Sequence, residues 1–312
     1  MSLDVELIDA ARTAARKAAD VHRVELGHLG PESWSEKGTA DFVTEVDREA
    51  ERRIIRHLQD RFPTHSFLAE EGTNIQEPAS AEQGPATREA PNTRAPIRWI
   101  IDPLDGTTNW LHGYPEYAVS IAALDADGLR AAVVINSATG EEFDAVRGGG
   151  TRCDGRPVRT SEVRDLRLGL VGTGFPFKHR EFVPRYLRAL GDVLIHSSGV
   201  RRAGAAALDL CALARGRLDA FWEFWLMPWD VAAGVLIVRE AGGAFGPLRI
   251  SDDAAVSAAG IEGARFVRLC SGDAAGEPPG GGAYIAANRH LLPALCVVLG
   301  ADLPAAAPAS SI

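Results

Sequence analysis

Four short β-type runs lie close together in the N-terminal half of the chain and restrict the folds open to it. They are Trp99–Ile101, Ala118–Leu124, Ala131–Asn136 and Glu142–Arg147. The pairs Asp127-Gly128 and Thr139-Gly140 separate the last three runs, and such pairs are typical of tight connections between antiparallel neighbours. The pattern predicts an antiparallel sheet.

Two amphipathic helices precede this sheet. Apolar residues recur at helical spacing at Leu7, Ile8, Ala11, Ala15 and Ala18, and again at Val46, Ala50, Ile54, Leu58 and Phe62. Thr44 is well placed to cap the second helix. We therefore expect residues 1–150 to form a helix pair on an antiparallel sheet.

Strands and helices alternate after Gly148-Gly149-Gly150. The predicted strands are Leu168–Val171, Ala220–Glu223 and Tyr284–Ala287, and the predicted helices are Phe182–Leu190, Ala205–Ala214, Val231–Ala241 and Leu291–Leu299. Residues 151–302 should thus form a mixed α/β half, followed by a frayed tail at 303–312. The expected fold class is α/β, an α+β layered sandwich of two halves packed without a linker. Gly72–Arg98 has no periodicity and predicts a long surface excursion.

Composition excludes several classes of protein. The chain has 312 residues, of which 46% are hydrophobic, and its net charge of −9 provides no general basic surface for nucleic acid or anionic lipid. The N-terminus does not follow the pattern of a signal peptide, and the apolar run Val231–Val238 is too short to span a membrane. Four cysteines without C-x-x-C spacing predict neither a zinc site nor a disulfide framework. We expect a cytoplasmic protein.

Segment Trp99–Trp110 carries the clearest chemical pattern. Its apolar strand runs directly into Asp102 and Asp105, which lie three positions apart. Both carboxylates and the carbonyl of Leu104 can converge on one point at the strand end. Oxygen ligands of this kind suit a hard cation such as Mg²⁺.

Each acidic group also has a plain structural interpretation. Asp102 and Asp105 can cap a helix that begins just after them, and Asp230 can cap the helix that begins at Val231. The pair Glu70-Glu71 follows a strand-like run at Ser66–Ala69 and can be a solvated surface pair. No single cluster decides between these alternatives.

Taken together, the motifs resemble the inositol monophosphatase family. The resemblance runs from Ala14 to Leu299 and is carried by Ala69–Gly72, Asp102–Asn109, Pro228–Gly234 and Glu240–Gly243. The early segment Lys37–Asp47 and the helical segment Arg201–Gly216 match as well. This resemblance implies a phosphatase that uses two to three Mg²⁺ ions per active site.

The resemblance also implies the metal ligands. One ion would take Glu70, Asp102 and the Leu104 carbonyl, and a second would take Asp102, Asp105 and Asp230. Glu70 would also help to hold a third, weaker ion through water. Two divalent ions about 4 Å apart can clamp the attacking and leaving oxygens of an in-line displacement, so no phosphoenzyme is required.

By the same resemblance, the nucleophile is a water whose proton passes to Glu70 and Thr107, while Asp47 orients the Thr107 hydroxyl. The backbone N–H groups of Gly106 and Thr107 would bind a phosphate oxygen at a helix start. Thr107 can equally be a simple helix N-cap. The implied substrate-binding residues are Asp105, Gly106, Thr107, Gly204, Ala205, Glu223 and Asp230.

Glu223 is expected to accept hydrogen bonds from substrate hydroxyls. Its alternative role is a solvated glutamate or an ion-pair partner of Arg201 or Arg202. Ala205 departs from the family, which usually has serine or threonine there, so a hydroxyl contact is lost.

Inositol monophosphate is the leading substrate among small phosphorylated polyols. Relatives that cleave fructose bisphosphate, histidinol phosphate or 3′-phosphoadenosine phosphates share the same ligands, and the fold alone does not separate them. A different hypothesis is a regulatory partner of the transcription machinery that does not bind nucleic acid directly. The resemblance further implies a homodimer and inhibition by lithium.

Overall fold

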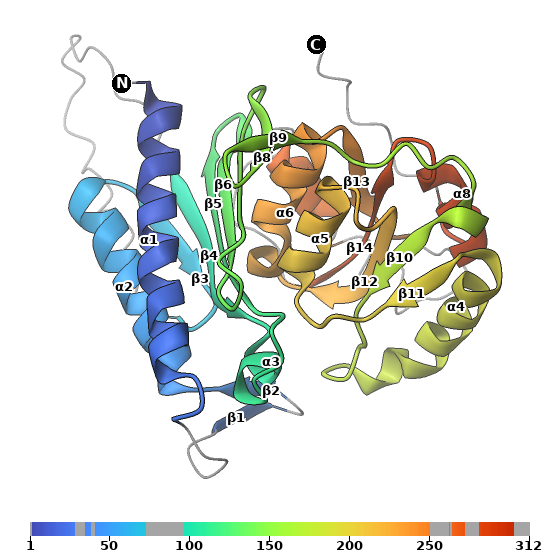
Figure 1. Ribbon diagram of the computed structural model, residues 1–312, viewed down its shortest axis with the longest axis horizontal. Coiled ribbons are helices and arrows are strands. Elements are labelled where there is room, and N and C mark those ends of the chain that lie inside the picture. The colour runs from blue at the N-terminus through green and yellow to red at the C-terminus, as the bar shows by residue number, and fades with distance from the viewer. Residues whose placement is uncertain are drawn as a thin grey trace, which may run out of the picture.

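The computed structural model describes residues 2–28, 35–38, 41–72, 97–249, 262, 264–271 and 281–302, with the backbone alone at 35–38 and 41–43. Helices and sheets alternate in five layers: a helix pair, a seven-stranded sheet, a second helix pair, a five-stranded sheet and a third helix pair (Figure 1). The predicted fold class is confirmed. The tail 303–312, residue 39, the Lys37 side chain and most of the two regions 72–98 and 251–282 lie outside the described residues.

The first layer is the predicted pair of helices, α1 (Leu3–Glu25) and α2 (Glu45–Arg61). Helix α2 begins where the sequence predicts, because the Thr44 hydroxyl accepts the N–H groups of Val46 and Asp47 while Asp47 accepts the N–H of Thr44. The apolar faces of both helices pack on the first sheet. A short two-stranded ribbon, β1 (Ser35–Gly38) and β2 (Asp41–Val43), connects them along the chain.

The first sheet has the strand order β3-β4-β5-β6-β7-β8-β9. Its strands are β3 (Ser66–Ala69), β4 (Arg98–Asp105), β5 (Ala118–Asp125), β6 (Gly128–Asn136), β7 (Glu142–Val146), β8 (Gly150–Cys153) and β9 (Arg156–Val158). All neighbours are antiparallel except β3 and β4, which are parallel. A parallel pair requires a long connection, and residues 70–97 separate these two strands along the chain. The sheet continues beyond residue 150, so we propose that the two halves of the chain meet after Val158.

A β-bulge interrupts the end of β4. Asp102 pairs with Ser120 and Asp105 with Ala118, so three steps along β4 match two steps along β5. Pro103 lies in this bulge and has no N–H to donate to the ladder. The bulge thus places one extra residue between the two aspartates, at the point where the sheet borders the cavity described below.

The second sheet is mixed and has the order β11-β10-β12-β14-β13. Its strands are β10 (Leu170–Thr173), β11 (Gly199–Arg201), β12 (Ala220–Leu226), β13 (Gly243–Pro247) and β14 (Gly282–Asn288). Helices α5 (Ala206–Ala214) and α6 (Pro228–Glu240) lie between the two sheets, and α4 (Val183–His196) and α8 (Leu292–Leu299) cover the outer face (Figure 1). Among the helices of the described residues, none is both long and apolar enough to span a bilayer.

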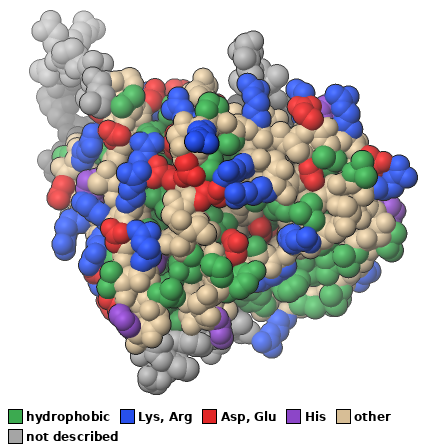
Figure 2. Space-filling model, viewed as in Figure 1, with side chains coloured by type: hydrophobic (Ala, Val, Ile, Leu, Met, Phe, Trp, Pro, Cys, Tyr) green, Lys and Arg blue, Asp and Glu red, His purple; other side chains and the backbone are tan. Residues whose placement is uncertain are grey.

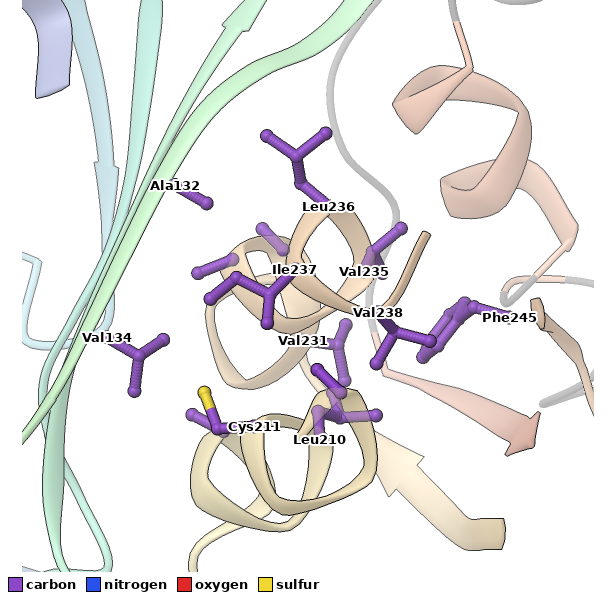
Figure 3. Packing of buried hydrophobic residues seen from close by; sticks show 14 of the residues in the cluster. Ala132, Val134, Leu210, Cys211, Val231, Val235, Leu236, Ile237, Val238 and Phe245 are labelled. Carbon is purple, nitrogen blue, oxygen red and sulfur yellow. The ribbon is translucent and has the colours of Figure 1, made fainter. Parts of the chain in front are cut away.

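The largest core cluster joins the two halves. Side chains of α5 and α6 pack against one face of the first sheet and against β13 (Figure 3). Val134 on β6 and Phe245 on β13 lie at opposite sides of this layer. Burial between two sheets explains why α6 is apolar on nearly every side, a pattern typical of an internal helix.

Close packing between α5 and α6 depends on Gly234. A Cβ atom at this position would lie 2.3 Å from Leu210 Cδ1 and 2.8 Å from Leu210 Cβ. Gly234→Ala is therefore expected to lower the free energy of unfolding by about 1–3 kcal/mol, the usual range for overpacking. Urea denaturation measures the effect. Gly191→Ala on α4 is the matched control, because a Cβ there meets nothing within 4 Å and should stabilise the helix by about 0.5–1 kcal/mol.

Candidate active site

A cavity of about 310 Å³ opens where the bulge of β4 faces the second half of the chain. Its lining contains every predicted metal and substrate residue: Glu70, Asp102, Leu104, Asp105, Gly106, Thr107, Gly204, Ala205, Glu223 and Asp230. Asp47 does not line the cavity and lies one hydrogen bond behind it. The fold therefore gathers residues that are up to 160 positions apart in the sequence, counting from Glu70 to Asp230.

Asp105 and Asp230 each commit one carboxylate oxygen to the fold. Asp105 Oδ2 accepts the N–H of Ala207 at 2.8 Å, in the first turn of α5. Asp230 Oδ2 accepts the N–H of Met227 at 2.7 Å, the residue that precedes α6. Both aspartates thus serve helix starts, although Asp105 serves α5 rather than the helix next to it in sequence.

Asp102 is buried at the last regular position of β4. Its Oδ1 accepts the N–H of Leu104 at 3.0 Å, which stabilises the bulge. Burial raises the pKa of Asp102 well above its usual range, and repulsion from Glu70, Asp105 and Asp230 contributes to a smaller extent. A carboxylate in this environment requires a nearby positive charge to ionise readily.

A chain of hydrogen bonds connects Thr107 to the start of α2. The Thr107 hydroxyl can donate its one hydrogen to Asp47 Oδ1, at 2.9 Å, or to the Leu104 carbonyl, at 3.1 Å. The other oxygen of Asp47 accepts from the N–H and the hydroxyl of Thr44. Thr107 is not the cap of α3 (Thr107–Leu111); that position belongs to Gly106, without a side-chain bond.

Gly106 has a conformation and a position that suit glycine alone. Its φ of 88° is left-handed, and a Cβ atom would lie 2.8 Å from the Glu116 carbonyl oxygen. The turn that it forms brings the N-terminus of α3 to the cavity. The backbone N–H of Thr107 therefore lies in the same cavity as the carboxylates of the candidate metal ligands.

Glu70 enters the cavity at the end of β3. Its N–H donates to the Ile101 carbonyl at 3.2 Å, which extends the parallel pairing by one residue. The next N–H, of Glu71, donates to Glu51 Oε2 at 2.8 Å, and Glu51 is fully buried on α2. The backbone that carries Glu70 is therefore held by both the sheet and α2.

Glu223 lies on β12, in the second sheet, and lines the same cavity as the residues of the bulge. Its carboxylate occupies the space next to Gly174 that a larger residue there would need, since a Cβ at Gly174 would lie 1.9 Å from Glu223 Oε1. Burial, with repulsion from Asp209 and Asp230, raises the pKa of Glu223 well above its usual range, while Arg202 acts to lower it. In the described part of the chain, neither Arg201 nor Arg202 lies within 4.0 Å of the Glu223 carboxylate as an ion-pair partner, so the predicted alternative of an ion pair is not observed; Arg202 acts on Glu223 only through its charge.

The donor set fits Mg²⁺. Burial and mutual repulsion raise the pKa of Asp105 to about 7 and that of Asp230 to about 8, so the site concentrates negative charge that a divalent cation would neutralise. Every candidate ligand is an oxygen, as Mg²⁺ prefers. No three of these carboxylates approach one another within 4.8 Å among the described residues. This open spacing suits an ion that usually keeps several water or substrate ligands.

Among the described residues, Glu141, Cys153 and Asp154 form a separate group whose ligand atoms lie within 4.8 Å of one another. Glu141 is already paired with Arg215 and Arg217. Burial raises the pKa of the Cys153 thiol to about 12, which disfavours the thiolate in the metal-free protein.

Three parts of the cavity were not predicted from the sequence. Segment Phe175–His179 forms one wall, and Lys178 lowers the pKa of both Asp105 and Asp230. Asn109 donates to the Glu116 and Ala203 carbonyls at 2.6 and 2.9 Å and so connects the two halves. Asp209 lies deeper, buried on α5. Lys178 carries no distinctive sequence signal, because only the fold brings this loop lysine to the cavity, whereas Asn109 ends the motif Asp102–Asn109.

Comparisons with known proteins agree with this geometry. The model of the "Inositol monophosphatase family" matches residues 4–263. The chain is 43% identical over 239 residues to "Nus factor SuhB" of Pseudomonas aeruginosa, covering 76% of this chain and 83% of that one. It is 36% identical over 295 residues to "Inositol-1-monophosphatase" of Rhizobium meliloti, covering 95% and 93%.

Solved structures give the same result. The extragenic suppressor protein suhB from Bartonella henselae superimposes with a TM-score of 0.76 and 34% identity, over 94% of this chain and 98% of that one. The inositol monophosphatase from Anabaena has a TM-score of 0.72 and 28% identity, over 96% of each chain. Fold, cavity and sequence similarity lead to one conclusion: the chain belongs to the inositol monophosphatase family.

Proposed function

We propose that this protein is a Mg²⁺-dependent phosphatase that hydrolyses a small phosphate monoester, with inositol monophosphate as the leading substrate. The observation that carries the proposal is the convergence of Glu70, Asp102, Asp105 and Asp230 on one cavity beside the N-terminus of α3. Glu70, Asp102 and the Leu104 carbonyl would hold one ion, and Asp102, Asp105 and Asp230 a second. Bound there, Mg²⁺ would neutralise the phosphoryl group and lower the pKa of an attacking water.

Groups around the ions would accept the proton of the attacking water and bind the phosphate. Thr107 donates its hydroxyl hydrogen toward Asp47, so a lone pair of Thr107 Oγ1 is available to accept a proton from water. Glu70 is the second acceptor in reach of the same region. The N–H groups of Gly106 and Thr107 would bind a phosphate oxygen, since helix starts favour anions.

The part of the cavity that contains Glu223 would recognise the hydroxyl groups of the substrate. Glu223 can accept hydrogen bonds from two adjacent ring hydroxyls, and its carboxylate is a poor neighbour for a second phosphate. Arg202 assists by favouring the ionised form of Glu223. Ala205 offers no hydroxyl, so any contact there would come from the backbone of Gly204 and Ala205.

Glu223→Ala is expected to lower kcat/KM for inositol monophosphate by roughly 10- to 100-fold, the loss expected for charge-assisted hydrogen bonds. Hydrolysis of nitrophenyl phosphate, which has no ring hydroxyls, should change little because the metal ligands are untouched. Steady-state kinetics on both substrates measures the difference. Equal losses on both, or no loss on either, would show that Glu223 does not confer specificity.

The function itself is tested by a phosphate-release screen with Mg²⁺. The panel should contain inositol monophosphate, fructose bisphosphate, histidinol phosphate and 3′-phosphoadenosine 5′-phosphate. We expect the highest kcat/KM for inositol monophosphate. A preference for one of the others would move the protein to another branch of the superfamily, and no release from any of them would contradict the proposal.

A second candidate function is regulatory contact with the transcription machinery. The observation in its favour is the printed name of a 43% identical relative, a Nus factor. Acidic and basic side chains are interspersed on the face seen in Figure 2, and the net charge is −9, which favours a protein partner over direct binding to nucleic acid. Recovery of RNA polymerase components with the tagged protein, together with no Mg²⁺-dependent phosphate release, would reverse the ranking.

A homodimer in the cytoplasm forms part of the same proposal. Helix α4 exposes Leu187, Leu194 and Ile195, and large exposed apolar side chains are typical of contact surfaces. The four cysteines are all buried and free, which suits a reducing compartment.

A further inference from the structure

A bulge with an unusual backbone conformation interrupts β12 next to the candidate active site. Glu223 pairs with Tyr284 and Leu226 with Gly282, so three steps along β12 match two steps along β14. Trp225 lies in this bulge with a φ of 63°, which is left-handed. Bulky aromatic residues rarely adopt this conformation, because their Cβ comes too close to the backbone. Such outliers persist only where the surrounding structure holds them, and they cluster at functional sites.

The bulge determines the direction in which the indole of Trp225 points. Successive side chains of a regular strand point to opposite faces of the sheet. Here Phe224 and Trp225 both pack in the apolar cluster formed with α4 and α8, while Leu226 belongs to the cluster between the two sheets. The left-handed residue therefore brings the indole to the outer face of the second sheet, where a regular strand would not have placed it.

On that face the indole contacts one wall of the cavity. The wall segment, Phe175–His179, follows β10 and lines the cavity. The ring centroid of Trp225 lies 4.5 Å from that of His179, at the end of the wall segment, and 5.6 Å from that of Phe182. A Cβ on Gly281, just before β14, would lie 2.9 Å from Trp225 Nε1. The indole is therefore in contact with both the sheet and the wall segment.

The other end of the wall segment has contacts of its own. The Arg202 guanidinium lies 5.0 Å from the ring centroid of Phe175 and 5.3 Å from that of Phe177, which are cation–π distances. Phe175 also meets Tyr186 of α4 edge-on, with centroids 5.6 Å apart. Ring contacts thus hold the wall segment at both ends, and Trp225 supplies the closest one at the His179 end.

We propose that Trp225 is a positioning residue whose indole holds the wall segment against the cavity and thereby sets the affinity for the hydroxyl-bearing part of the substrate. Glu223, the proposed acceptor for the substrate hydroxyls, lies two residues before Trp225, and its carboxylate adjoins Gly174, which directly precedes the wall segment. The wall segment carries none of the candidate metal ligands. Its displacement should therefore weaken substrate binding more than the chemical step. The inference rests on the proposed function, because it concerns the same cavity.

Three substitutions at position 225 separate the role of the ring from that of the backbone. Trp225→Ala removes the indole and keeps a left-handed residue with a Cβ. Trp225→Gly also removes the indole but relieves the backbone, since glycine adopts this conformation freely. Trp225→Phe keeps an aromatic ring. The glycine variant should melt a few degrees above the alanine variant, although both should bind the substrate equally poorly.

Steady-state kinetics with inositol monophosphate and amide hydrogen exchange measure the effect. For Trp225→Gly and Trp225→Ala we expect KM to rise about 3- to 10-fold with little change in kcat, as for the loss of one aromatic contact that contributes to binding. Exchange should become faster at Phe177 and His179, whose N–H groups donate to carbonyls within the wall segment. Trp225→Phe should keep most of the wild-type affinity.

Asp154→Gly is the matched control. Asp154 is the other non-glycine residue with a left-handed φ among the described residues, at 49°, and it does not line this cavity. Glycine there relieves a backbone of the same kind without touching the wall segment. The control should leave both KM and the exchange at Phe177 and His179 unchanged.

His179→Ala tests whether Trp225 acts through the wall segment. Trp225 itself lines the cavity, so a direct contact with the substrate is the alternative. His179→Ala removes the ring that meets the indole and should raise KM by a similar factor. The double variant with Trp225→Gly should then be no worse than either single variant. Additive increases in KM would mean that the indole binds the substrate directly, and would overturn the positioning role.

Failure of this inference can be told apart from failure of the proposed function. If the wild-type protein hydrolyses inositol monophosphate and the glycine and alanine variants show unchanged KM or unchanged exchange, Trp225 only fills the core and the proposed function stands. If the alanine variant binds poorly and the glycine variant binds normally, the defect follows stability rather than the ring. If the wild-type protein releases no phosphate from any monoester, the proposed function fails and the substrate role of Trp225 fails with it.

Discussion

Asp105→Asn and Asp230→Asn are each expected to lower the turnover of phosphate monoesters by orders of magnitude while leaving the fold intact. One oxygen of each carboxylate accepts a backbone N–H, of Ala207 or Met227 respectively, and an asparagine carbonyl can keep that bond. The amide group then replaces the second oxygen and removes the negative charge that a cation would require. Loss of a charged metal ligand removes the stabilisation of the leaving oxygen.

Turnover and the melting temperature should be measured on both variants, with Asp105→Ala as a comparison. Alanine also breaks the bond to Ala207, and loss of such a helix-start bond typically costs about 0.5–2 kcal/mol. A folded asparagine variant with near-normal turnover at ordinary Mg²⁺ would contradict the two-metal assignment. Unfolding of both asparagine variants would instead mean that the carboxylates serve only the helix starts.

Removing divalent cations should have an equally large effect. Phosphate release should stop in excess chelator and return when Mg²⁺ is restored. Ca²⁺ should inhibit, because it prefers more ligands and longer bonds than in-line attack requires. Lithium should inhibit as well, as the family resemblance implies. Full activity in excess chelator would contradict the proposed mechanism.

The same carboxylates predict how pH alters the stability of the chelated protein. Asp105 and Asp230 have folded-state pKa values of about 7 and about 8, above their ordinary value of 3.8. Between pH 3.8 and the folded-state pKa values, the folded protein binds more protons than the unfolded chain. The contribution of these two groups to the free energy of unfolding is therefore fully present below about pH 4 and is lost as the pH rises through 7 and 8. Mg²⁺ should therefore raise the melting temperature more at pH 8 than at pH 5. An equal rise at both pH values would show that the carboxylates are not the binding groups.

Local sequence patterns were sufficient for most of the fold. Helix α2 was predicted because Thr44 and the apolar spacing after it are strong local signals, and β4 to β7 were predicted from their apolar runs. Short strands were missed: β9 is Arg156–Val158 and is mostly exposed, so it has no alternation to detect. Helix α4 extends to His196, beyond the predicted end at Leu190, because its exposed apolar side chains obscure the periodicity.

The candidate site was predictable only where its residues sit in short motifs. Asp102, Asp105 and Asp230 adjoin strand or helix ends that the sequence marks with proline and glycine. By contrast, the β4 bulge follows from pairing with β5, which no local pattern specifies.

The bond from Ala207 N–H to Asp105 has a consequence for motion. Asp105 belongs to the first part of the chain and Ala207 to the second. A second bond between the same two parts runs from the Asn109 side chain to the Ala203 carbonyl. A relative motion of the two parts of the chain that breaks these bonds would displace Asp105, a proposed cation ligand. We therefore expect substitutions at residues 203–207 to change both the rate of amide hydrogen exchange in β4 and the occupancy of the proposed cation site.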